Sequence, residues 1–343
     1  MQRHKIAFTL CVGLAMILAS SAALAQYQLT NLDSNQFATA RHIDPLMVNA
    51  WGLARGAGGP FWISDAGSGW STLYNGLGAI KSLKVLVPSA SGAGPGSPTG
   101  IVANGSSDFQ LGGWPTFFLF ATLDGTISGW APETNPNDAI IAPLHNPPAG
   151  AVYTGLAITS HPSGNLLFAA DLANSQVDVY DGTFNFVHSF TDSSLPAGFA
   201  PFGIHDINGL VYVAFASTSG GNGGFIDVFT ESGTLARPQP LVQGAPLNQP
   251  WGIAVAPANF GKLSNTLLIS NNTNTGTMNA FNLVTGQYVG TVRDTNGKEI
   301  HIDQLWGIAF GGGTTNNGRT NQLFFTAGPH NNLTGTFGVI SLP

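Results

Sequence analysis

Four acidic or amide side chains stand where short apolar runs of this sequence end. Oxygen donors of this kind can ligate a hard metal ion when they converge. Aspartate or asparagine at the end of a strand more often bonds the nearby backbone in a turn. The turn is the favoured interpretation, and a metal held by the four residues is the alternative. They are Asp65, Asp124, Asp171 and Asn271.

The adjacent pair His205-Asp206 is the main candidate for acid-base chemistry. A histidine beside a carboxylate can act as a general base. The simpler alternative is a polar residue that lines a hydrated channel, because water satisfies such a side chain there. The histidines do not form the close pair that zinc hydrolases place on one helix. His205 is therefore a catalytic candidate, and we predict no metal site and no cofactor.

The composition indicates a β protein. Only 8% of the 343 residues are charged, and glycine occurs 45 times. The apolar runs are short, rich in β-branched or aromatic residues, and broken by turn-forming residues, as in proteins with many short strands. The chain has 11 basic and 17 acidic residues, which makes nucleic acid and anionic membranes poor partners.

Residues 1–25 have the features of an export signal. A basic start precedes an apolar run over residues 6–19, and a small-x-small cleavage motif ends at Ala25. We expect a mature chain that begins at Gln26, lies in the periplasm or outside the cell, and has no membrane segment. Cys11, the one cysteine, lies in this signal, so the mature chain has no disulfide.

An internal repeat indicates the elements that must position the candidate residues. An aromatic residue or threonine, then glycine, then leucine or isoleucine, recurs six times at intervals of 48 to 55 residues. Each copy continues with further apolar runs separated by turn residues, as in a blade of four antiparallel strands. The copies are Trp51-Gly52-Leu53, Thr99-Gly100-Ile101, Thr154-Gly155-Leu156, Phe202-Gly203-Ile204, Trp251-Gly252-Ile253 and Trp306-Gly307-Ile308. We predict an all-β, six-bladed β-propeller that forms a single domain over residues 26–343.

The ends of the chain predict how the ring closes. The sixth repeat lacks a fourth strand, whereas residues 27–33 form a strand-like run ahead of the first repeat. We expect the N-terminal strand to complete the last blade, which removes exposed strand edges. The repeat glycines should lie where the inner strands crowd the axis, and should allow a positive φ at the turn between blades.

The repeat also predicts a mouth of the central channel. The aromatic residues before the glycines should ring one mouth, and the strand-end aspartates and Asn271 should return to the same face. Position 205, occupied by histidine, corresponds to alanine or valine in the other five repeats.

Several phrases resemble one known family. "WGLARGAGGPFWISDAGSGWSTLYNG", "NQPWGIAVAPANFG" and "VRDTNGKEIHIDQLWGIAFG" are similar to an exported bacterial family of conserved hypothetical proteins, with NHL-like six-bladed propellers as wider kin. The resemblance covers nearly the whole mature chain and implies the propeller fold, but no established activity. Leu123 stands where that family often has an acidic residue, and the loop 217–224 is shortened.

More distant six-bladed kin include calcium-dependent lactonases and esterases. In those enzymes the residue before the inner-strand glycine is typically Glu, Asn or Asp. This sequence has two threonines and four aromatic residues there, and these cannot supply the oxygen ligands that calcium needs. The sequence therefore argues against a calcium site of that design.

Two functions of different classes remain. The first is a monomeric binding module whose channel mouth takes a small molecule, a glycan or a partner protein. Its candidate ligand-binding residues are Trp51, Thr99, Thr154, Phe202, Trp251, Trp306, Asp65, Asp124, Asp171 and Asn271. The alternative for the aromatic residues is that they plug the channel as core. The second is a metal- or cofactor-assisted hydrolase, lyase or quinone oxidoreductase that uses the three aspartates and His205.

Overall fold

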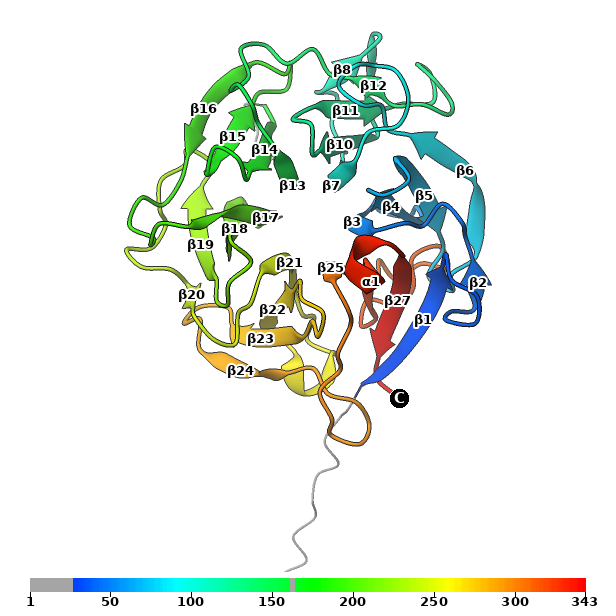
Figure 1. Ribbon diagram of the computed structural model, residues 1–343, viewed down its shortest axis with the longest axis vertical. Helices are drawn as coiled ribbons and strands as arrows, with labels where there is room; N and C mark the ends of the chain where they lie inside the picture. The colour runs from blue at the N-terminus through cyan, green and yellow to red at the C-terminus, as the bar shows by residue number, and fades with distance from the viewer. Residues whose placement is uncertain (1–26, 161–163) are drawn as a thin grey trace, which may run out of the picture.

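The structure, a computed structural model, describes residues 27–160 and 164–343. Six antiparallel sheets stand around a central axis, as Figure 1 shows. The predicted six-bladed propeller with four antiparallel strands per blade is confirmed. The predicted export signal and Gln26 lie outside the described residues.

In each of the first three blades the strands follow one another in chain order from the axis outward, and blade 2 has a separate hairpin inserted after its first strand. Blade 1 contains β3 (Ala50–Arg55), β4 (Phe61–Asp65), β5 (Trp70–Tyr74) and β6 (Ile80–Leu86). Blade 2 contains β7 (Pro98–Ala103), β10 (Phe118–Thr122), β11 (Ile127–Trp130) and β12 (Ile140–Ile141). Blade 3 contains β13 (Tyr153–Thr159), β14 (Leu166–Asp171), β15 (Gln176–Tyr180) and β16 (Phe186–Phe190). A separate hairpin pairs β8 (Gln110–Leu111) with β9 (Trp114–Pro115).

The last three blades follow the same plan, but blade 6 uses both ends of the chain. Blade 4 contains β17 (Phe199–Ile207), β18 (Leu210–Ser217), β19 (Phe225–Thr230) and β20 (Val242–Gln243). Blade 5 contains β21 (Pro250–Val255), β22 (Thr266–Asn271), β23 (Met278–Asn282) and β24 (Tyr288–Thr291), with the short helix η1 (Gly261–Leu263) between β21 and β22. Blade 6 contains β25 (Leu305–Phe310), β26 (Leu323–Ala327), β27 (Thr336–Ser341) and β1 (Gln28–Ser34), with the short helix α1 (Pro329–Asn332) between β26 and β27.

The N-terminal strand closes the ring as predicted. β1 pairs antiparallel with β27, with Leu29 opposite Ile340. A further strand, β2 (His42–Ile43), pairs parallel with β1 at the outer edge, so blade 6 has a fifth strand that the repeat did not predict. The extra strand covers the edge that β1 would otherwise expose.

Burial explains the apolar runs. All five residues of β4 and of β10 are buried, because a blade packs against a neighbour on each face and its second strand has no solvent side. The outer strand β6 alternates between more and less exposed residues over most of its length. The sequence pattern therefore changes from continuous to alternating between the inside and the rim of a blade.

The hydrophobic core is divided among the interfaces between blades. Phe61 of blade 1 packs on Phe324 of blade 6 with ring centroids 4.4 Å apart, and Trp62 packs on Phe118 of blade 2 at 4.1 Å. Each other pair of neighbouring blades shares a cluster of the same kind. No helix within the described ranges is both long enough and apolar enough to span a membrane.

The repeat glycines lie where neighbouring inner strands touch. A Cβ atom on Gly203 would stand 2.0 Å from the Trp251 carbonyl oxygen, and one on Gly52 would stand 2.2 Å from that of Thr99. The predicted crowding is confirmed. The predicted positive φ at these glycines is wrong. In three blades the positive φ belongs instead to the residue just before the inner strand, Asn49, Gln249 or Gln304.

Candidate functional site

The two threonines of the repeat join neighbouring blades. Thr99 Oγ1 donates to the Tyr153 carbonyl at 2.7 Å, and Thr154 Oγ1 donates to the Phe202 carbonyl at 2.8 Å. Both threonines are buried. Their hydroxyl hydrogens are used inside the ring, so these side chains stabilise the interfaces between blades.

The four aromatic residues of the repeat pack against one another at the axis. Trp51 stacks on Trp306 with ring centroids 3.8 Å apart. Phe202 and Trp251 lie 5.6 Å and 5.9 Å from Trp306. We call these four residues the aromatic plug. The sequence left open whether these rings border a mouth or plug the channel. Trp51 and Trp306 are only 6% and 3% exposed, because the other rings cover their faces, whereas Phe202 and Trp251 are half-buried.

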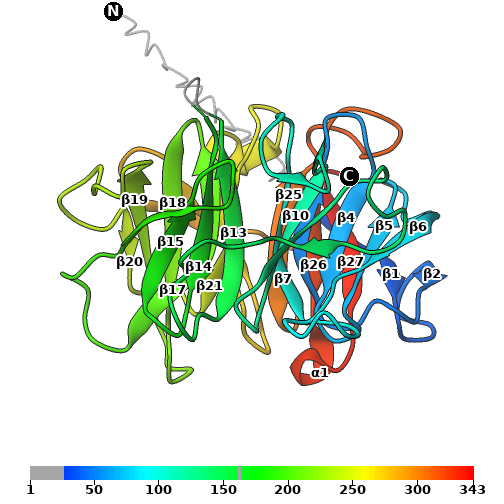
Figure 2. The same ribbon diagram turned by 90° about the horizontal axis from the view of Figure 1, so that it is seen from above.

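Polar contacts hold the aromatic plug in place. Trp306 Nε1 donates to Asn49 Oδ1 at 3.0 Å and to Asn332 Oδ1 of α1 at 3.3 Å. Trp251 Nε1 donates to the Thr154 carbonyl at 2.9 Å. Figure 2 shows α1 projecting from one face of the disc. The inner strands begin at this face, and the aromatic plug fills the axis there.

Two of the predicted strand-end carboxylates are buried and engaged by neighbours. Asp65 accepts a hydrogen bond from Thr72 Oγ1 at 2.6 Å, and burial raises its pKa well above the usual range. Asp171 accepts bonds from the Val152 amide at 3.1 Å and from the Asn174 side chain at 2.6 Å. Both are fully buried. Asp171 bonds loop residues on both sides, whereas Asp65 bonds strand β5 and its Oδ1 has no hydrogen-bond partner in the described chain.

The other two strand-end residues also bond to loops. Asn271 Oδ1 accepts from the Asn248 amide at 3.0 Å, and Asp124 Oδ2 accepts from the Ala90 amide at 2.7 Å. Within residues 27–160 and 164–343, no three His, Cys, Asp or Glu side chains are grouped so as to hold a metal ion. The four residues therefore bond to four separate parts of the chain, Asp65 to strand β5 and the other three to loops.

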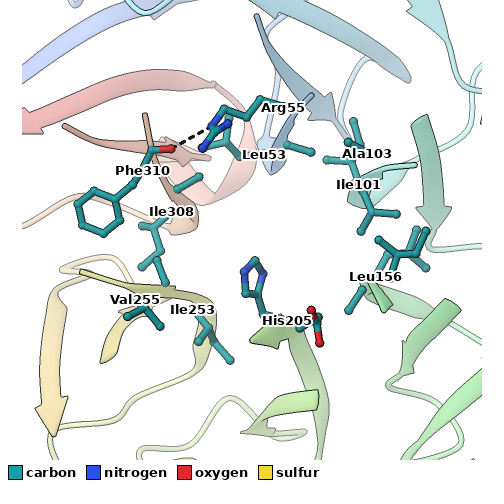
Figure 3. Close-up of a pocket in the computed structure, with 17 residues that line it drawn as sticks. Leu53, Arg55, Ile101, Ala103, Leu156, His205, Ile253, Val255, Ile308 and Phe310 are labelled. Carbon is teal, nitrogen blue, oxygen red and sulfur yellow. Dashed lines mark hydrogen bonds between the residues drawn. The ribbon is translucent and has the colours of Figure 1, made fainter. Parts of the chain in front are cut away.

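The other half of the channel contains a cavity of about 440 Å³. All six inner strands line it with residues that follow the repeat glycines. Its walls are mostly Leu, Ile, Val and Ala side chains, as Figure 3 shows. Pockets that bind small molecules have this size range. The channel is thus filled at one end and hollow at the other.

His205 lies in this cavity, and its ring points into the open space in Figure 3. The side chain is solvent-exposed, and it makes no hydrogen bond with the part of the chain that the structure describes. Desolvation by the channel walls lowers its pKa. Because the ring keeps an accessible surface, that effect is weaker than in a dry core. A neutral imidazole offers one donor and one acceptor to a ligand.

Arg55 lies in blade 1, across the ring from His205 in blade 4. Its Nε donates to the Phe310 carbonyl of blade 6 at 3.1 Å, the dashed line in Figure 3. Burial lowers its pKa. The guanidinium forms no ion pair with any described carboxylate. Its other nitrogens are therefore available at the wall of the cavity.

Sequence reasoning found His205 but missed Arg55. The signal was present, because Arg55 is the one Lys or Arg in the six inner strands. It stands three residues after its repeat glycine, where the other blades have Ala103, Ile158, Asp206, Val255 and Phe310. The prediction considered the residues before the glycines and the strand ends, whereas the cavity lies at the other end of the inner strands.

Comparisons with known proteins give relatives of undetermined activity. No family model matches the chain. The uncharacterized protein R648 of Acanthamoeba polyphaga mimivirus is 29% identical over 93% of this chain and 81% of its own length. The uncharacterized protein L690 of the same virus is 28% identical over 84% of this chain and 79% of its own length. These relatives are viral proteins, whereas the resemblance indicated a bacterial family.

Solved structures share the propeller architecture. A gluconolactonase, XC5397 from Xanthomonas campestris, is 14% identical and has a TM-score of 0.55 over 87% of this chain and 89% of its own. Virginiamycin B lyase from Staphylococcus aureus is also 14% identical, with a TM-score of 0.54 over 93% of this chain and 100% of its own. Identities this low establish similarity of fold, and the fold hosts many different activities.

Proposed function

We propose that the protein is a small-molecule binding module that takes its ligand into the hollow half of the central channel. One observation carries the proposal, a cavity of about 440 Å³ lined by all six inner strands. The aromatic plug fills the axis at the other end. A pocket whose walls are already ordered strands binds without the cost of ordering a loop.

Acid-base catalysis in the same cavity is the second candidate. It is supported by His205, whose imidazole faces the cavity with a lowered pKa and no hydrogen-bond partner among the described residues. Asp206, its neighbour in the chain, instead accepts a bond from the Gly209 amide at 3.0 Å. Lactonase and lyase structures share the fold. We rank binding first because no carboxylate in the described chain orients the imidazole.

Export and a monomeric state complete the proposal. The features of residues 1–25 support export to the periplasm or the medium. A propeller that closes its own ring supports a monomer, because each inner strand already has neighbours on both sides. Size-exclusion chromatography with light scattering, and immunoblotting of fractions from an expressing cell, test these two points.

A channel-filling variant tests the binding proposal. Ala309 occupies in blade 6 the position that His205 occupies in blade 4, and it lines the cavity. Ala309→Phe should fill part of the cavity and weaken binding of the neutral fluorescent probe phenylnaphthylamine at least tenfold. Ala149→Phe, at an exposed loop alanine, is the matched control and should leave the affinity unchanged. Equal binding by wild type and Ala309→Phe would place the probe outside the channel and reject the proposal.

A further inference from the structure

The hollow half of the channel is cationic on one wall, although the chain as a whole carries a formal net charge of −6. Arg55 is partly buried at this wall and has no carboxylate partner among the described residues. Removing an unpaired charge from water is unfavourable, and a bound anion offsets that cost. An arginine placed in this way is therefore suited to hold an anionic group.

The geometry leaves the guanidinium free to do so. Its Nε hydrogen is used by the Phe310 carbonyl at 3.1 Å, which fixes the plane of the group against blade 6. No hydrogen bond within the described chain uses the two terminal nitrogens. Guanidinium groups bind carboxylate, sulfonate and phosphate oxygens through such paired N–H donors.

The other polar residues of the cavity define where an anion can lie. Asp206 is the one carboxylate among the lining residues of the described chain, and it accepts a bond from the Gly209 amide at 3.0 Å. It belongs to blade 4, across the ring from Arg55. An anion should therefore bind on the Arg55 side, with His205 reaching from the opposite wall as a neutral hydrogen-bonding group.

The rest of the lining is apolar. Ile101, Leu156, Ile253 and Ile308 are at most 6% exposed, because they pack between blades. The half-buried apolar residues that line the cavity form a belt: Leu53, Val102, Ile158, Val255 and Phe310. Apolar surface buried against such a belt supplies affinity, whereas the few polar groups supply orientation.

We propose that the channel binds small amphipathic anions, in which one carboxylate or similar acidic group pairs with Arg55 and an apolar body packs on the belt. The inference rests on the proposed binding function and goes beyond it by naming the class of ligand and Arg55 as its specificity residue. Neutral apolar compounds of the same shape should bind without the contribution of Arg55.

Two fluorescent probes that differ by one acidic group test this. Anilinonaphthalene sulfonate carries a sulfonate on the same apolar body as phenylnaphthylamine. Arg55→Gln should weaken binding of the sulfonate probe about tenfold, the usual effect of losing one charge-assisted hydrogen bond, and should change the neutral probe less than about twofold. Arg237→Gln is the matched control, because Arg237 also donates to a backbone carbonyl, that of Val284, but lies at the outer surface.

A second measurement uses the unaltered protein, in case Arg55→Gln does not fold. Octanoate should displace the sulfonate probe at a concentration at least tenfold below that needed for octanamide. Equal potency of the two competitors, or equal weakening of both probes by Arg55→Gln, would overturn the assignment of an anionic ligand and leave the binding function in place. Failure of both probes to bind the wild-type channel would instead overturn the binding function itself.

Discussion

Single hydroxyl groups connect successive blades near the axis. In blades 2 and 3 the hydroxyl belongs to the residue before the repeat glycine, Thr99 or Thr154. In blades 5 and 6 the second strand supplies it instead, through Ser270, which donates to the Trp306 carbonyl at 2.7 Å, and Thr326, which donates to the Trp51 carbonyl. A tryptophan can then occupy the position before the glycine. This exchange accounts for the tryptophans of blades 5 and 6, whereas in blade 1 the corresponding Ser64 hydroxyl has no hydrogen-bond partner in the described chain.

Thr154→Val tests the contribution of one such link. Valine has nearly the same shape, but it cannot donate to the Phe202 carbonyl, so the buried oxygen loses a partner. We expect the free energy of unfolding to fall by about 1–2 kcal/mol, measured by denaturant titration. Thr315→Val, at an exposed threonine whose hydroxyl makes no hydrogen bond within the described chain, should change it by less than about 0.5 kcal/mol. A neutral effect of Thr154→Val would show that the hydroxyl does not stabilise the interface.

Residue types alone could not reveal how the aromatic side chains pack. The sequence placed Trp51, Phe202, Trp251 and Trp306 at equivalent positions of the blades, and the structure agrees. Whether rings at such positions border an opening or fill it depends on the width of the channel and on their rotamers. The stack of Trp51 on Trp306 at 3.8 Å is a contact between blades 1 and 6, and no local pattern records it.

The inner strands show how far a repeat predicts an element. The regular spacing of the repeat correctly predicted where the inner strands begin and where backbones approach closely at the glycines. It could not distinguish the two ends of a strand as sites, because both ends face the channel. It also missed β2, whose two residues pair with β1 through tertiary contact and not through any repeated motif.

Two glycine substitutions should differ sharply although their sequence contexts match. A Cβ on Gly203 would stand 2.0 Å from the Trp251 carbonyl oxygen, which is backbone and cannot rotate away. One on Gly155 would stand 3.1 Å from the Phe202 carbonyl oxygen. We expect Gly203→Ala to destabilise the fold by about 3 kcal/mol or more and Gly155→Ala by about 1 kcal/mol. Thermal unfolding that ranks them in the reverse order would contradict the described strand spacing.

The closing strand offers a test of blade 6. Leu32 of β1 is 1% exposed and packs in the cluster shared by blades 6 and 1, whereas Leu29 of the same strand is 37% exposed. Leu32→Ala should lower the free energy of unfolding by about 2–4 kcal/mol, because it leaves a cavity at the joint of the ring. Leu29→Ala should cost less than about 1 kcal/mol. Equal effects would argue against β1 as the closing strand.

At the scale of the whole ring, dividing the core among blade interfaces places acidic groups in apolar surroundings. Burial, and then the charge of a nearby aspartate, raises the pKa of Asp33 to about 8, that of Asp227 to about 7 and that of Asp178 to about 6. The neighbouring charges belong to Asp44, Asp192 and Asp171 respectively. The folded ring therefore holds protons that the unfolded chain releases at the same pH.

The direction of the resulting pH dependence follows from this proton uptake. A carboxyl group whose pKa is higher in the folded state than in the unfolded state destabilises the fold once the pH exceeds the pKa of the unfolded state, near 3.8. The penalty grows until the pH reaches the folded value, about 6 to 8 for these three groups. We expect the melting temperature to rise as the pH falls from about 8 to about 5. A melting temperature that falls over this range would contradict the burial of these groups.

Asp227→Asn isolates one of these groups. The amide has the shape of the carboxyl group but no charge, so at pH 8 Asp227→Asn should stabilise the fold by about 1–3 kcal/mol. At pH 5 the gain should be much smaller, because the wild-type carboxyl group is then protonated in the folded ring. Asp181→Asn is a control of opposite sign. Burial favours the neutral form of Asp181, but hydrogen bonds from Asn185 and Thr183 outweigh it and lower its pKa, so this substitution should destabilise the fold at pH 8. Denaturant titrations at pH 8 should therefore show a higher free energy of unfolding for Asp227→Asn and a lower one for Asp181→Asn than for the wild type. A gain for Asp227→Asn that is the same at pH 5 and pH 8 would assign its effect to packing and not to charge.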